Sequence, residues 1–275
     1  MEKLRRSERV LLLTQRLLAR PGELFSLGDF AEELGAAKSS LSEDLALVGE
    51  AVERLGVGRI ETLTGAAGGV RYLPRMAGKD VVRLAEDICR RLVEPERLLP
   101  GGFLYLTDLV FHPALAEAVG TAFATRFAPL EPQCVLTVET KGIPLALMTA
   151  RSLGVPLSVA RHGSRPSEGP AVSINYVSGS SGRIQTMVLP RRAVPSGARV
   201  LIVDDFMKAG GTSLGMVDLV REVDAVVAGV GVLVATAEPA KKLVERYDAL
   251  VVLEEGAESG PRYAAAPAPW VRTLA

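Results

Sequence analysis

Two adjacent carboxylates stand at the end of a strongly apolar run, and a glycine pair follows them. Asp204 and Asp205 can accept hydrogen bonds from two neighbouring hydroxyls of a sugar. Gly210 and Gly211 let the backbone adopt positive φ and approach a ligand closely, and the amides that open the next helix suit a phosphate. This order of residues predicts a ribose-phosphate site at the carboxyl end of a strand. The predicted contacts are Asp204, Asp205, Lys208, Ala209, Gly210, Gly211, Thr212 and Ser213.

The surrounding sequence alternates short apolar strands with helices, which predicts an α/β fold with a parallel sheet. An amphipathic helix over Val81–Leu92 and a helix over Pro113–Phe127 lead into this pattern, and His112 is placed to cap the second helix. The predicted strands are Cys134–Val138, Pro156–Ala160, Val200–Val203, Ala225–Val234 and Leu250–Leu253. The predicted helices between them lie near Ile143–Leu153, Thr212–Val223 and Pro239–Tyr247.

A second candidate anion site follows the first of these strands. Thr140, Lys141 and Gly142 place a lysine and a glycine at a helix start, which suits an anion such as pyrophosphate. An ordinary turn between a strand and a helix has the same composition, so these residues alone leave both interpretations open. Tyr105 lies in a segment that is able to approach the same ligand.

A β-hairpin is predicted over Ala171–Val177 and Ile184–Leu189, with the Ser178–Arg183 tip between its strands. Serine and glycine in this tip provide hinges, so the tip is able to fold over a ligand. We expect Arg183 to close on a phosphate. A solvent-exposed loop without a ligand is the alternative for this segment.

The first seventy residues predict three short helices and a hairpin, the layout of a winged helix. The start of the third helix enters the DNA major groove in that layout. The helices are expected from Leu4 to Leu18, from Ser26 to Leu34 and from Lys38 to Leu55, and the strands over Gly58–Leu63 and Gly69–Leu73. Hydroxyls and acids in the first turn of the third helix are typical of a helix start.

Short polar side chains at the start of the third helix are the candidates for DNA contact. The predicted contacts are Lys38, Ser39, Ser40 and Ser42, with Arg71 on the hairpin. Charge alone adds Arg90, Arg91 and Arg97 of the second domain as candidates for phosphate contact. Acidic and basic residues are nearly balanced in this region, so the local sequence also allows an interaction or dimerisation module.

The composition predicts two globular domains, over residues 1–73 and 74–275. The 32 Lys+Arg balance the 32 Asp+Glu, so the total charge does not reveal a basic coat for nucleic acid. No signal peptide or membrane span is predicted, which favours the cytoplasm. Cys89 and Cys134 are expected to be buried thiols, and no His/Cys cluster indicates a metal site.

The Asp204–Thr212 segment closely resembles the phosphoribosyl pyrophosphate (PRPP) motif of type I phosphoribosyltransferases. Its Asp-Asp-Phe-Met-Lys-Ala-Gly-Gly-Thr form is similar to that of the purine operon repressors of Gram-positive bacteria, and Lys38–Leu45 resembles the same family. The resemblance implies a winged-helix domain followed by a phosphoribosyltransferase-like domain with a flexible hairpin loop. In type I phosphoribosyltransferases the loop that matches Thr140–Gly142 contacts the pyrophosphate of PRPP.

The same resemblance implies a homodimeric repressor of purine synthesis and transport genes, in which PRPP binds without turnover and relieves repression. In some relatives a guanosine polyphosphate competes for the pocket. No cofactor is implied, and whether Mg²⁺ accompanies PRPP stays open. The alternative is a catalytically active purine phosphoribosyltransferase, because the acidic pair and the turn over residues 208–213, here called the phosphate turn, are both preserved.

Overall fold

The computed structural model describes residues 4–65, 68–99, 103–163, 169–177, 182–255 and 263–274. Two compact units make up the chain. One contains the residues up to Ala77 together with Arg151–Gly154, and the other contains the remaining residues.

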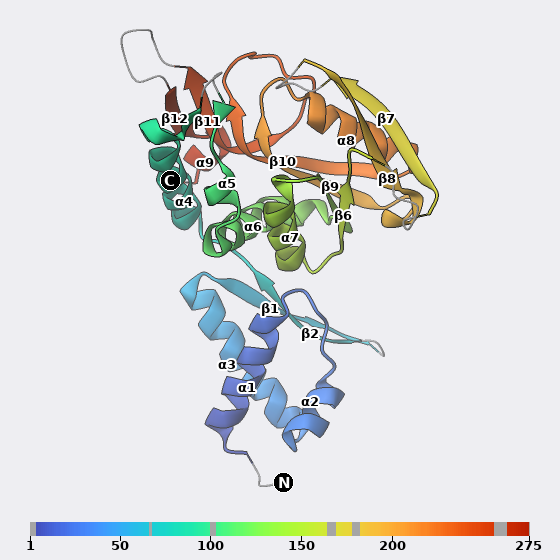
Figure 1. Ribbon diagram of the computed structural model, residues 1–275. Coiled ribbons are helices and arrows are strands. Elements are labelled where there is room, and N and C mark those ends of the chain that lie inside the picture. The colour runs from blue at the N-terminus through green and yellow to red at the C-terminus, as the bar shows by residue number, and fades with distance from the viewer. Residues whose placement is uncertain are drawn as a thin grey trace. The chain divides into compact units, whose positions relative to one another are not determined.

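The first unit has three helices followed by a two-stranded antiparallel sheet, as predicted (Figure 1). Its elements are α1 (Arg6–Ala19), α2 (Leu27–Leu34), α3 (Lys38–Leu55), β1 (Gly58–Leu63) and β2 (Gly69–Pro74). Ala66 and Ala67 of the predicted hairpin tip lie outside the described residues. This arrangement is that of a winged helix.

Local sequence signals explain most of the helix ends in this unit. The Ser26 hydroxyl accepts a hydrogen bond from the Asp29 amide at 3.0 Å, and Gly35 ends α2 in the left-handed region. The predicted bounds of α3, from Lys38 to Leu55, are confirmed, and Ala37 occupies its N-cap position. The hydroxyl of Ser42 donates to the Lys38 carbonyl within the helix. The first amides of α3 are therefore left without a side-chain cap.

The core of the first unit is a single apolar cluster drawn from all three helices and from β2. Leu13 and Leu17 lie one turn apart on α1, so both face the cluster. Phe30 of α2 is only 1% exposed and stacks on Phe25, with 5.3 Å between the ring centroids. The remaining buried members are Leu34, Leu41, Leu45, Val48, Val52, Val70 and Tyr72.

The second unit is built on a six-stranded sheet in the order β12-β11-β10-β9-β5-β6. All neighbours in this sheet are parallel except β11 and β12. The strands are β5 (Cys134–Val138), β6 (Leu157–Ala160), β9 (Arg199–Met207), β10 (Val226–Thr236), β11 (Asp248–Glu255) and β12 (Tyr263–Pro267). The predicted parallel sheet is confirmed, and its antiparallel edge strand β12 was not predicted.

Helices cover the sheet on both faces, with α6 and α7 on one side and α8 on the other (Figure 1). The Nδ1 atom of His112 accepts from the Leu115 amide at 3.4 Å, which confirms the predicted cap of α6. The longer helices are α4 (Gly78–Leu92), α6 (Pro113–Phe127), α7 (Gly142–Leu153) and α8 (Gly211–Glu222). The short elements are β3 (Leu98–Leu99), β4 (Phe103–Leu104), α5 (Thr107–Val110) and α9 (Pro269–Arg272).

The predicted hairpin is present as β7 (Ala171–Val177) paired antiparallel with β8 (Ile184–Pro190). It packs against α8, the helix that follows the acidic pair. Ser178–Ser181 of its predicted tip lie outside the described residues.

The predicted helix over Pro239–Tyr247 is wrong, because this segment is a series of bends. Polar groups of this segment form hydrogen bonds with other parts of the chain instead of the backbone hydrogen bonds of a helix. The Lys242 ammonium donates to the Thr236 carbonyl at 2.7 Å, and the Leu243 amide donates to the Ala209 carbonyl at 2.9 Å. Tertiary contacts therefore override the local helix propensity.

Replacing Phe30 with alanine tests whether the first unit depends on its small core. We expect Phe30→Ala to lower the free energy of unfolding by about 3–5 kcal/mol, because it leaves a cavity in a small cluster. Calorimetry should show an earlier transition for the first unit. Leu18→Ala is the control, since Leu18 is 39% exposed, and an equal loss of stability in both variants contradicts the assignment.

Candidate functional site

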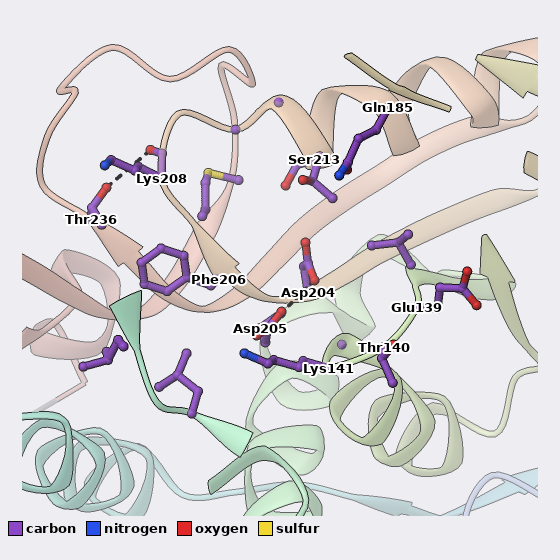
Figure 2. Close-up of a pocket in the computed structure, with 18 of the residues that line it drawn as sticks. Glu139, Thr140, Lys141, Gln185, Asp204, Asp205, Phe206, Lys208, Ser213 and Thr236 are labelled. Atoms are coloured by element: carbon purple, nitrogen blue, oxygen red, sulfur yellow. Dashed lines mark hydrogen bonds between the residues drawn. The ribbon is translucent and has the colours of Figure 1, made fainter. Parts of the chain in front are cut away.

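A cavity of about 550 Å³ lies in the second unit, and it joins the acidic pair, the turn after it and the predicted pyrophosphate loop. Figure 2 shows side chains from β9, from the start of α8 and from the loop before α7 around this space. Its lining residues are Leu104, Leu106, Val138, Glu139, Thr140, Lys141, Gly142, His162, Tyr176, Gln185, Asp204, Asp205, Phe206, Met207, Lys208, Gly210, Gly211, Thr212, Ser213, Thr236, Leu253 and Tyr263.

The acidic pair lies on β9, which is longer than predicted and continues to Met207. Asp204 is buried, and one of its oxygens accepts a hydrogen bond from the Asp205 amide at 2.9 Å. Burial, and then the charge of Asp205, raise the pKa of Asp204 well above its usual value. Burial also raises the pKa of Asp205, although the charge of Lys141 opposes this effect. The pair is therefore a costly concentration of negative charge, and hydroxyl donors of a ligand would stabilise it.

The turn after the acidic pair presents backbone amides to the cavity. Gly210 has φ of 87°, a conformation that side-chain-bearing residues rarely adopt, and it precedes the first residue of α8. No side chain caps this end of the helix. The first amides of an α-helix have no partner within the helix, so this turn is suited to an anion.

The loop before α7 approaches the acidic pair very closely at Gly142. A Cβ atom at position 142 would lie 2.3 Å from Thr137 Oγ1 and 3.0 Å from Asp204 Oδ1. Glycine is therefore required there. Glu139 orients the other end of the loop, because its carboxylate accepts from the His162 amide at 2.8 Å. The Glu139–Thr140 peptide bond is cis.

The hairpin contributes two polar side chains to the cavity. The Tyr176 hydroxyl of β7 donates to Gln185 Oε1 of β8 at 2.7 Å. The same hydroxyl lies within hydrogen-bonding reach of Thr212 in the phosphate turn, and burial raises the pKa of Tyr176. The end of the hairpin next to its tip, where Tyr176 pairs with Gln185, is therefore connected to the start of α8.

The opposite end of the cavity is mostly apolar, and no single sequence motif marks it. Its members come from widely separated segments, and they are Leu104, Leu106, Phe206, Leu253 and Tyr263. The buried guanidinium of Arg97 fixes the segment that carries the first two, because it donates to both Asp108 oxygens and to the Tyr105 carbonyl. Arg97 is therefore committed to internal contacts, and its proposed role in DNA contact is wrong. Arg90 and Arg91 each pair with Asp87.

The cavity brings together ten of the thirteen residues predicted to contact the ligand. Tyr105, Ala209 and Arg183 do not line it, although Leu104 and Leu106 on either side of Tyr105 do. Glu139, His162, Tyr176, Gln185 and Thr236 line the cavity without having been predicted as contacts. Glu139 could have been predicted from the sequence, since it directly precedes the predicted loop. The other four reach the cavity only through tertiary packing, which no local motif reveals.

The predicted DNA contacts lie at the start of α3 and on β2. Lys38, Ser39 and Ser42 are exposed, and Ser40 is partly exposed. Arg71 is less available than predicted, because its guanidinium pairs with Glu61 on the neighbouring strand.

Two further properties follow from the residues that the structure describes. Within those ranges, no group of three or more His, Cys, Asp or Glu side chains is arranged to hold a metal ion. None of the described helices combines the length and apolar character that a membrane span requires. Cys89 and Cys134 are both buried and free, and burial raises the pKa of Cys89 to about 11.

Comparison with solved structures supports the fold of the second unit. The adenine phosphoribosyltransferase of Giardia lamblia aligns with a TM-score of 0.52 at 20% identity, over 66% of this chain and 99% of that chain. Residues 107–265 also match the model for the phosphoribosyl transferase domain. A winged helix followed by this fold defines a class of DNA-binding regulators built on a phosphoribosyltransferase domain.

The first unit identifies the family within that class. Residues 5–74 match the model described as the N-terminal domain of the bacterial purine repressor. The purine biosynthesis transcriptional repressor PurR of Bacillus subtilis is 48% identical over 251 residues, which cover 91% of this chain and 88% of that protein. The probable purine biosynthesis regulator PurR of Streptococcus pneumoniae is 43% identical, over 90% of this chain and 91% of that protein.

The chain therefore belongs to the purine repressor family of Gram-positive bacteria. It is a DNA-binding transcription repressor of purine biosynthesis rather than an enzyme.

Adding one methyl group at position 142 should damage the site. We expect Gly142→Ala to lower the free energy of unfolding by about 1–3 kcal/mol, because the new Cβ forces Thr137 and Asp204 apart. Gly163→Ala is the matched control, since a Cβ there meets no atom within 4 Å. Thermal unfolding measures both variants, and equal midpoints contradict the close approach at Gly142.

The acidic pair predicts a particular dependence of stability on pH. Because the pKa of Asp204 is raised on folding, the folded chain holds more protons than the unfolded chain between the two pKa values. The free energy of unfolding therefore falls as pH rises through that range. Asp204→Asn removes this titration, and its amide oxygen can still accept from the Asp205 amide.

We expect the melting temperature of Asp204→Asn, relative to the original chain, to increase from about pH 4 to about pH 8. The control is Asp218→Asn, which changes an exposed carboxylate on α8. If the difference in melting temperature between Asp204→Asn and the original chain stays constant over this pH range, Asp204 is not the titrating group.

Proposed function

We propose that PRPP is the effector of this repressor and that its binding relieves repression of purine synthesis and transport genes. One observation carries the proposal: a single cavity joins the acidic pair, the amide-lined turn and the Thr140–Gly142 loop. PRPP has a sugar diol between a phosphate and a pyrophosphate, so it presents three groups that suit these three parts of the cavity.

Each part of the cavity has a chemical counterpart in PRPP. The ribose hydroxyls donate to Asp204 and Asp205, which relieves the cost of their burial. The 5′-phosphate accepts from the turn over residues 208–213, and the pyrophosphate lies at the loop that carries Lys141. Arg183 does not line the cavity in this structure, and we propose that it contacts a phosphate of the bound ligand.

Relief of repression requires that PRPP and DNA favour different states of the protein, and the coupling must be reciprocal. PRPP also adds about four negative charges, which oppose association with a polyanion. We propose no cofactor, and any Mg²⁺ would enter with the phosphates of the ligand.

We further propose that a guanosine polyphosphate competes for the same cavity. Its phosphates suit the turn and the loop, and a purine ring suits the apolar end formed with Leu106 and Phe206. PRPP has no nucleobase, so it leaves that end of the cavity unfilled.

We also propose that the protein acts in the cytoplasm as a homodimer, because a winged helix that binds paired half-sites requires two-fold symmetry. Sedimentation of the purified chain with and without an operator duplex measures this state. A monomer on DNA would contradict the proposal.

Removing one carboxylate of the acidic pair separates effector binding from DNA binding. We expect Asp204→Ala to bind an operator duplex as the original chain does, and to lose relief by PRPP. Gel-shift titration, with and without Mg²⁺, measures both properties. Asp218→Ala on the exposed face of α8 is the control. Normal PRPP sensitivity of Asp204→Ala would place the effector elsewhere, and release of nucleotide from PRPP and a purine would indicate an enzyme.

A further inference from the structure

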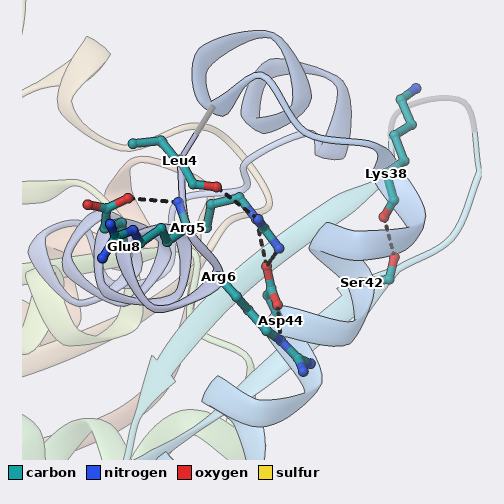
Figure 3. Close-up of polar contacts among 8 residues, drawn as sticks. Leu4, Arg5, Arg6, Glu8, Lys38, Ser42 and Asp44 are labelled. Carbon is teal, nitrogen blue, oxygen red and sulfur yellow. Dashed lines mark hydrogen bonds and ion pairs between the residues drawn. The ribbon is translucent and has the colours of Figure 1, made fainter. Parts of the chain in front are cut away.

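A buried carboxylate in the first unit holds two arginines of α1 against α3 (Figure 3). Asp44 is 1% exposed, and it lies six residues after Lys38, about 9 Å along the axis of α3. Arg6 Nε donates to one of its oxygens at 2.9 Å, and Arg9 Nε donates to the other at 3.0 Å. Asp44 therefore connects the start of α1 to the helix that is expected to enter the major groove.

The two arginines have different roles in this cluster. Arg9 uses all three nitrogens within the protein: two contact Asp44, and Nη1 donates to the Leu4 carbonyl at 3.3 Å. Its side chain is only 14% exposed. The Arg6 side chain is 58% exposed and is held through Nε. Among the residues that the structure describes, none accepts a hydrogen bond from its two terminal nitrogens.

Charge distinguishes Arg6 from Arg16 and Arg20, each of which pairs with a glutamate of its own. One carboxylate faces two guanidinium groups at Asp44, so the cluster keeps one net positive charge. Elsewhere in this unit, Glu33 pairs with Arg16 and Glu23 with Arg20 one to one, whereas Glu61 is shared by Arg59 and Arg71. Arg6 thus combines a fixed orientation with a charge that the protein does not neutralise.

We propose that Arg6 donates to a backbone phosphate of the operator at the edge of the groove that α3 enters, and that Asp44 positions it. The first helix of a helix-turn-helix crosses the DNA backbone, so the start of α1 is suitably placed. A guanidinium matches a phosphate well, and anchoring Nε lowers the entropy cost of the contact. The contact strengthens binding to any DNA sequence, because a phosphate carries no sequence information.

The full-length chain and two duplexes test this proposal. One duplex is the best binder that the original protein selects from a random pool, and the other has the same bases in scrambled order. We expect Arg6→Gln to lower the affinity for both duplexes by a similar factor, roughly tenfold at 0.1 M salt. The slope of log affinity against log salt should become shallower by about 0.9 for each phosphate that the variant no longer neutralises.

Arg16→Gln is the matched control, since it removes the same charge from α1 at a site about 15 Å along the helix. Ser39→Ala should weaken binding mainly to the selected duplex, as expected for a residue that contacts bases. PRPP binding should be unchanged in Arg6→Gln, and thermal unfolding checks that the variant stays folded at the assay temperature although Asp44 has lost one of its two partners. Equal affinities and salt slopes for Arg6→Gln and Arg16→Gln would overturn the phosphate contact.

Arg6→Lys tests the positioning role of Asp44. Lysine keeps the charge but has a single nitrogen. It cannot hold the Asp44 carboxylate with one nitrogen and offer two others to a phosphate, as arginine can. We expect Arg6→Lys to keep the salt slope of the original chain and to bind both duplexes with intermediate affinity. Affinity equal to that of the original chain would show that Asp44 does not contribute through orientation.

Discussion

The ligand cavity depends on one unfavourable placement: the Asp204 carboxylate is buried beside a second acid. Its pKa is raised because burial removes water and Asp205 adds a like charge. Gly142 is in close contact with the same carboxylate, so the predicted pyrophosphate loop and the acidic pair form one unit. A ligand that supplies hydroxyl donors to the acids and an anion to the neighbouring amides relieves both costs at once.

The winged helix has to bind the negatively charged DNA backbone, and few of its positive charges are available for this. Four of its nine described arginines pair with glutamates and two pair with Asp44, whereas no described acid pairs with Lys38 at the start of α3. A module with few unpaired cations makes few phosphate contacts, so its affinity for DNA should depend only moderately on salt. Two copies on paired half-sites compensate for a modest affinity of each copy.

Much of this architecture was predictable, because strand periodicity, glycine stops and the acidic motif are local signals. Those signals identified β5, β7 and the helices of the first unit with nearly correct ends. The errors occur where tertiary contacts decide, as at residues 239–247, whose backbone bonds to the phosphate turn instead of forming a helix. The apolar end of the cavity was unpredictable for the same reason, since its residues come from separate segments.

Asp44 and Asp204 are the two buried carboxylates among the described residues, and their partners explain their different roles. Asp44 accepts from two guanidinium groups, so its charge is satisfied within the protein and it serves to orient side chains. Asp204 accepts a hydrogen bond from the amide of Asp205, and the charge that acts on it most strongly is that of another acid. Removing a cationic partner from Asp44 would leave a buried charge poorly compensated, whereas a ligand that donates hydrogen bonds would compensate the buried charge of Asp204. The same residue type thus fixes two arginines in one unit and lines the cavity in the other.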